Sequence, residues 1–160
     1  MAVWQYDLHL IPRERLVAFL QGGNARLDET AFDSVEWWRG GVPRDLRRGF
    51  TEVFREGPSI EGQLLTWGTD DGNRVDVLLG EDGLARECFV RVDVRQLSAS
   101  PVWQILELAR EWDCLVVTER LDVLEPAAAT IAEDLAQSRA SRYVRDPHGY
   151  LTQLREPSTE

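Results

Sequence analysis

Few side chains in this sequence have the type and spacing that enzyme chemistry requires. His9 follows Asp7 by two residues in an alternating segment, and an aspartate on the same strand face can orient an imidazole for general-base catalysis. No serine or cysteine nucleophile lies near this pair in the sequence, which favours two ordinary polar residues on a strand. The other histidine, His148, lies in a predicted turn, where exposure is expected.

The sequence also lacks the common motifs for cofactors, metals and covalent catalysis. It contains no lysine, which excludes a lysine Schiff base and the lysine-containing phosphate loop. It has no Gly-x-Ser-x-Gly, His-Glu-x-x-His or Cys-x-x-Cys. The segment 70–73 lacks the spacing of a calcium loop and is interpreted as a hairpin turn. We therefore predict no catalytic residue, no metal and no cofactor.

Charge narrows the classes of partner. The 160 residues include 28 acidic and 18 basic side chains, and the formal net charge is −10. All the basic residues are arginine, and those of segment 44–48 are interpreted as a solvated helix face. A chain this acidic repels phosphate, so neither nucleic acid nor an anionic membrane surface is an expected partner.

Cysteine content and the N-terminus indicate a compartment. The cysteines, Cys88 and Cys114, lie within short apolar runs and are predicted to be reduced thiols in the core. The first residues lack the basic and apolar regions of a signal peptide, and the apolar runs are far too short for a membrane span. The expected location is a bacterial cytoplasm.

Hydrophobic periodicity predicts an α+β order of elements. Strands are expected over 3–11, 63–67, 74–79, 85–95 and 114–118, with a further pairing segment at 121–124. Helices are expected over 13–21, 28–38, 43–56, 100–112 and 126–139, before a turn at 146–149 and a short packed segment at 150–154.

These elements predict a single layer of mostly antiparallel sheet, with about five to six strands, packed against helices on one face. Strand 114–118 is expected near the centre of the sheet, and the helical stretch 13–56 is an insertion after the first strand. Residues 1–155 form a single domain, and 156–160 form a frayed tail.

The strand alternation gathers charged residues on one face of the predicted sheet. This face carries Asp7, His9, Arg74, Asp76, Arg91, Asp93 and Arg95, and Glu87 and Phe89 share it along strand 85–95. Arginine–aspartate pairs on a solvated sheet are an ordinary stabilising feature. They also suit a docking surface, because the planar guanidinium group pairs bidentately. Both interpretations remain open on the sequence alone.

Two further features are candidate partner contacts. The turns beside the charged face contain Asp70, Asp71, Glu81 and Asp82 and are predicted to form the most negative edge of the molecule. Trp37 lies about 100° around its predicted helix from the inward-facing Trp38. It is interpreted either as a partly exposed contact residue or as packed beneath the glycines at 40–41.

Several segments carry a resemblance to known proteins. They are Val-Trp-Gln-Tyr-Asp-Leu-His-Leu-Ile-Pro at the start, Trp-Gly-x-x-Asp-Gly-Asn-Arg-Val-Asp-Val at 67–77, Val-Arg-Val-Asp-Val-Arg at 90–95 and Ser-Arg-Ala-Ser-Arg-Tyr-Val-x-Asp-Pro at 138–147. With them the chain resembles small uncharacterised bacterial cytoplasmic proteins, and its general build is similar to that of immunity proteins that neutralise secreted toxins. The resemblance implies a protein partner and no active site.

The sequence thus predicts a non-enzymatic protein-binding domain. Its most concrete form is an acidic immunity protein that blocks the active site of a basic cognate toxin, as a monomer or homodimer. One alternative is a small-molecule binder or an enzyme that uses Asp7, His9, Asp76, Arg91 and Asp93 around a pocket. Another is a homodimeric structural protein that pairs through the exposed sheet or Trp37.

Overall fold

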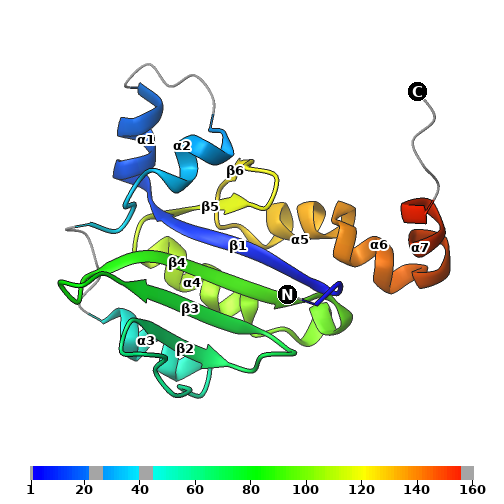
Figure 1. Ribbon diagram of the computed structural model, residues 1–160, viewed down its shortest axis with the longest axis horizontal. Helices are drawn as coiled ribbons and strands as arrows, with labels where there is room; N and C mark the ends of the chain where they lie inside the picture. Colours follow the sequence, from blue (N-terminus) through cyan, green and yellow to red (C-terminus); the bar gives the residue numbers. More distant parts are fainter. Residues whose placement is uncertain (1, 22–26, 40–44, 156–160) are drawn as a thin grey trace.

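The computed structural model describes residues 2–21, 27–39 and 45–155 and shows an α+β fold. Six strands form one antiparallel sheet in the order β2-β3-β4-β1-β5-β6 (Figure 1). Their bounds are β1 Gln5–Pro12, β2 Leu64–Gly68, β3 Arg74–Leu79, β4 Ala85–Asp93, β5 Cys114–Thr118 and β6 Val123–Leu124. The two central strands are β4 and β1. The sequence had suggested a central position for β5, which instead lies next to the edge strand β6.

Within the described residues, seven α-helices accompany the sheet. They are α1 Arg13–Gln21, α2 Glu29–Asp33, α3 Leu46–Val53, α4 Val102–Glu111, α5 Ala128–Gln137, α6 Arg139–Arg145 and α7 Pro147–Arg155, with a 3-10 segment η1 at Val94–Ala99. The predicted α+β class and the helices after the first strand are confirmed. In the part of the chain that the structure describes, no helix is long and apolar enough to cross a membrane.

Helix ends differ from the predicted bounds. Helix α2 ends at Asp33, whereas the sequence predicted a helix to residue 38. The helix predicted over 126–139 breaks at Ser138, whose backbone is extended and whose side chain accepts a hydrogen bond from the Ser141 amide (3.1 Å). Ser138 thus caps a new helix, α6. The segment predicted at 150–154 is part of α7.

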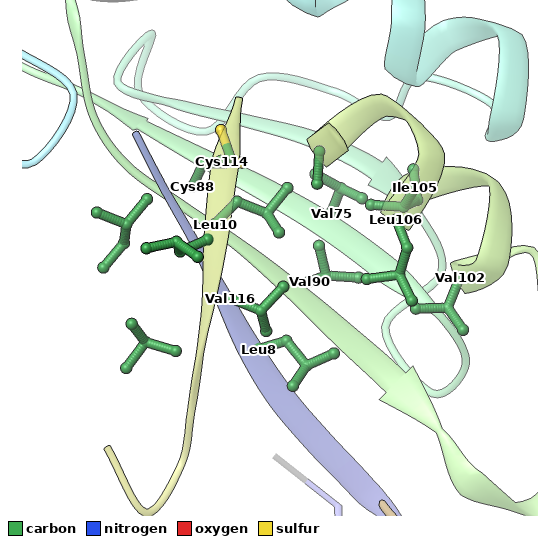
Figure 2. Packing of buried hydrophobic residues seen from close by; sticks show 14 of the residues in the cluster. Leu8, Leu10, Val75, Cys88, Val90, Val102, Ile105, Leu106, Cys114 and Val116 are labelled. Atoms are coloured by element: carbon green, nitrogen blue, oxygen red, sulfur yellow. The ribbon is translucent and has the colours of Figure 1, made fainter. Parts of the chain in front are cut away.

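The core lies between one face of the sheet and the helices α3, α4 and α5. Alternation along β1 turns Tyr6, Leu8 and Leu10 to this face, where each is at most 2% exposed. Figure 2 shows Leu8 and Leu10 in the same buried cluster as Val102, Ile105 and Leu106 of α4. Both cysteines are buried free thiols, as the sequence predicted.

One edge of the sheet is covered by a segment of the chain, and the other edge strand is very short. Residues 55–60 run along β2, where Gly57 donates a backbone hydrogen bond to Thr66 (2.8 Å) and Gly68 donates one to Arg55 (2.9 Å). At the other edge, β6 consists of only two residues. Short or covered edges prevent another chain from adding a strand. A macromolecular partner is therefore more readily accommodated on a face of the sheet than at an edge.

Helix α2 covers one end of the sheet's second face. His9 lies on this face, and its ring contacts Phe32 of α2 edge-to-face with centroids 4.9 Å apart. The Trp38 indole donates a hydrogen bond to the Leu10 carbonyl (2.7 Å), which fixes the chain after α2 to β1. Among the described elements, none lies over the rest of this face, where β3, β4 and the first half of β1 run side by side (Figure 1).

Candidate functional site: the open face of the sheet

Strand register brings the predicted charged residues together on the second face of the sheet. Asp7 pairs with Arg91 across β1 and β4, and Asp76 lies opposite Phe89 across β3 and β4. We define the open face by Asp7, His9, Arg74, Asp76, Glu87, Phe89 and Arg91, and α2 borders it at the His9 end.

Ion pairs hold the centre of the open face in place. Arg91 Nε lies 3.1 Å from Asp7 Oδ1, and both side chains are less than one-fifth exposed. Arg74 Nε lies 2.6 Å from Asp76 Oδ1. The Asp76 side chain is only 4% exposed, so this pair is buried. The interpretation of the face as a solvated sheet had assumed exposed pairs. Burial raises the pKa of Asp76, and the neighbouring Arg74 opposes that rise.

Asp93 and Arg95 form a separate structure at the end of β4. The strand ends at Asp93, whose carboxylate accepts hydrogen bonds from the Arg95 amide (3.0 Å) and from its guanidinium (2.7 and 2.9 Å). These bonds hold the pKa of Asp93 below its usual value. The Arg95 guanidinium also lies over the Trp4 ring, 4.3 Å from its centroid. Arg95 therefore lies in η1 beside the open face, beyond the strand predicted to residue 95.

The turn 70–73 is fixed to the N-terminal strand. The Gln5 side-chain amide donates to the carbonyls of Asp70 (2.9 Å) and Gly72 (3.1 Å), and the Trp4 indole donates to that of Asp71 (3.2 Å). The Asp70 carboxylate pairs with Arg74. These contacts give the turn a structural role and neutralise part of its charge.

The two acidic turns do not form one edge. The turn 70–73 joins β2 to β3, and the turn containing Glu81 and Asp82 joins β3 to β4, so the turns lie at opposite ends of β3. The expectation of a single acidic edge is wrong. Glu81 and Asp82 are exposed, and they lie at the end of the sheet that α2 covers.

Trp37 is not available as a contact residue. It is 2% exposed, its ring contacts Phe19 with centroids 5.4 Å apart, and its indole donates to the Phe32 carbonyl (3.0 Å). The prediction of partial exposure assumed a helix through residue 38. Because α2 ends at Asp33, both Trp37 and Trp38 turn into the core.

Glu87 is a site residue that the sequence reasoning did not select. It lies on β4 next to α2, half-buried, and has no ion pair or side-chain hydrogen bond with any described residue. Burial is the larger cause of the raised pKa of Glu87, and the like charge of Asp33 raises this pKa further. The alternation along β4 places Glu87 on this face, but the approach of Asp33 depends on tertiary packing.

A second buried network lies on the core side of the sheet. The Tyr6 hydroxyl donates to Asp134 Oδ2 (2.7 Å), and Arg120 also donates to this carboxylate. Burial, more than the Asp134 carboxylate, raises the pKa of Tyr6. Tyr6 is 2% exposed, whereas the Arg120 side chain is half exposed, and the network connects α5 to β1.

The described residues offer no metal site and little cavity at the open face. They contain no group of three or more His, Cys, Asp or Glu side chains that could hold a metal ion. The space bordered by His9, Phe32 and Glu87 is about 10 Å³, far below the volume of a typical ligand pocket. Comparisons with protein-family models, curated proteins and solved structures give no significant match, so function is inferred from this geometry alone.

Proposed function

We propose that this chain is a non-enzymatic protein-binding domain. In its most concrete form it is an acidic inhibitor of the immunity type, which neutralises a basic cognate toxin by covering the toxin's active site. The observation that carries the proposal is the open face, an antiparallel surface of paired arginines and aspartates that α2 borders at its His9 end.

The pairing within the open face suits protein recognition. Arg74 and Arg91 are held by Asp76 and Asp7 with side chains 14% and 18% exposed, so little side-chain freedom remains to be lost on binding. The alternative, a small-molecule binder or an enzyme, requires a pocket around Asp7 and His9, and the space beside His9 is only about 10 Å³.

Charge identifies the chemistry of the partner. The chain carries a net charge of −10, and opposite charge on a partner accelerates association by electrostatic steering. A toxin that acts on nucleic acid must carry a basic active-site surface to approach phosphate. An acidic inhibitor competes for that same surface, which is why we favour a basic nuclease- or deaminase-like partner.

The proposal is tested by co-expressing the tagged chain with the product of the adjacent gene. We expect a stable complex and protection of growth. The double variant Asp7→Asn/Arg91→Gln removes the central ion pair without changing the net charge. It should lower the affinity of the complex at least tenfold. The matched control, Arg48→Gln/Glu52→Gln, removes an exposed pair on α3 and should bind normally. Absence of a complex, or equal behaviour of both variants, would overturn the proposal.

A further inference from the structure

The carboxylates of the sheet's second face follow one rule of pairing. Asp7 contacts Arg91, Asp76 contacts Arg74, and Asp93, at the end of the same face, contacts Arg95. Glu87 is on the same face and departs from the rule, because no described arginine lies within 4.0 Å of its carboxylate. The charge that acts on it is the negative charge of Asp33. Each of the three aspartates therefore has its own arginine, and the half-buried carboxylate of Glu87 has none among the described residues.

An aromatic residue is the next residue after Glu87 on the same face of β4. Phe89 is two residues from Glu87 on β4, so both side chains point to the open face. The centroids of the Phe89 and His9 rings are 5.9 Å apart, and His9 in turn contacts Phe32 of α2. Phe89 thus ends a row of rings that begins at α2. The Phe89 side chain is partly exposed.

A ring beside a carboxylate is a favourable site for a guanidinium group. The planar group stacks on an aromatic face and can donate two parallel hydrogen bonds to one carboxylate. The local charge agrees, since Asp7, Asp33, Asp76 and Glu87 outnumber Arg74 and Arg91. An ammonium group is a compact, strongly hydrated charge and gains less from such a flat site.

We infer that Phe89 and Glu87 form a subsite for an arginine side chain of the partner protein, with the guanidinium stacked on the Phe89 ring and bonded to Glu87. The partner's arginine then completes the pairing rule of the face. This inference rests on the proposed function and names the group on the partner that the open face recognises.

The subsite is tested by NMR titration of the ¹⁵N-labelled full chain with acetyl-Gly-Arg-Gly-amide, and with the lysine peptide as comparison. We expect shifts centred on the Phe89, Glu87 and His9 amides, and at least fivefold weaker binding of the lysine peptide. Glu87→Gln and Phe89→Leu should each weaken arginine-peptide binding at least fivefold. Glu81→Gln, the same chemical change in an exposed turn, should not.

Specific outcomes overturn the subsite. They are shifts centred elsewhere, equal affinity for the two peptides, or equal loss with Glu81→Gln. The near-isosteric Glu87→Gln variant keeps the test decisive if Phe89→Leu does not fold. Loss of the subsite would leave the proposed function standing if the partner complex still depends on Asp7 and Arg91. Failure of that complex, with the peptide result intact, would remove the toxin partner instead.

Discussion

At the scale of single residues, Glu87 places a charge where the fold does not compensate for it. Burial and the charge of Asp33 both raise its pKa, so the ionised form is less favourable in the folded protein than in the unfolded chain. Residues that reduce stability are often kept because a binding surface needs them. A partner's guanidinium would supply the missing counter-charge, which connects this cost to the proposed subsite.

We predict that Glu87→Gln stabilises the protein at neutral pH. Because the folded-state pKa lies above the unfolded one, the folded state binds more protons between the two values, and stability decreases as pH rises through that interval. The amide does not titrate and avoids this loss. Urea unfolding should show a higher midpoint for the variant at pH 7, and no such gain below about pH 4.

The control for this prediction is Glu81→Gln, which makes the same change on an exposed turn. We expect it to alter the unfolding midpoint by less than Glu87→Gln does. A Glu87→Gln protein less stable than the wild type at pH 7 would show that Glu87 has a stabilising partner in solution, and would contradict our account of this residue.

At the scale of elements, α3 and α4 approach closely because a glycine faces a tryptophan. A Cβ atom at Gly49 would lie 2.8 Å from Cζ2 of Trp112 and 3.3 Å from Leu108 Cδ2. Trp112 also contacts Phe50 edge-to-face, with centroids 5.2 Å apart. Trp112 and Leu108 are partly buried and pack against the core, and the rigid indole ring presents the shortest of these approaches.

We predict that Gly49→Ala destabilises the protein by about 1–3 kcal/mol through overpacking, although alanine alone favours a helix. The measurement is denaturant unfolding, with near-UV circular dichroism to follow the Trp112 environment. Arg48→Ala changes a side chain that is 82% exposed on the same helix and should have little effect. A Gly49→Ala variant as stable as the wild type would show that α3 and α4 are not packed this closely.

Element type was predictable from the sequence, whereas element ends were less so. Period-two alternation identified the strands at 3–11, 74–79 and 85–95, because one side of the sheet is buried in a continuous core. The strands at 63–67 and 114–118 were identified as short apolar runs. The end of α2 was missed because Trp38 follows Phe32 and Val35 at helical spacing. In the structure Trp37 and Trp38 both pack inward from the segment after Asp33. Spacing cannot distinguish a helix from a turn whose two neighbouring side chains are both buried.

The candidate site was predictable in part. Alternation placed Asp7, Asp76 and Arg91 on one face, and the register shows that they lie on neighbouring strands. The order of strands in a meander already puts successive turns at opposite ends, which the single acidic edge overlooked. The proximity of Asp33 to Glu87 needs a contact between α2 and β4, and no local pattern specifies it.

At the scale of the whole molecule, charge is distributed unevenly. Helix α6 carries Arg139, Arg142 and Arg145, although the whole chain has a net charge of −10. Helices α6 and α7 extend away from the sheet (Figure 1). The acidic excess therefore belongs to the rest of the chain, which includes the open face and the turn at 80–83. A basic partner is attracted to that part before any side-chain contact forms.

We predict that association with the basic cognate partner is limited by long-range attraction, and dissociation by contacts on the open face. The association rate should fall at least tenfold between about 0.05 and 0.5 M salt, with little change in dissociation. Glu81→Gln/Asp82→Asn removes two negative charges away from the centre of the face and should slow association at low salt only. Asp7→Asn/Arg91→Gln keeps the net charge and should instead accelerate dissociation. Stopped-flow kinetics separate the two effects. If both double variants changed the same rate constant, the prediction would be wrong, because it assigns the association rate to the charges of the turn and the dissociation rate to contacts on the open face.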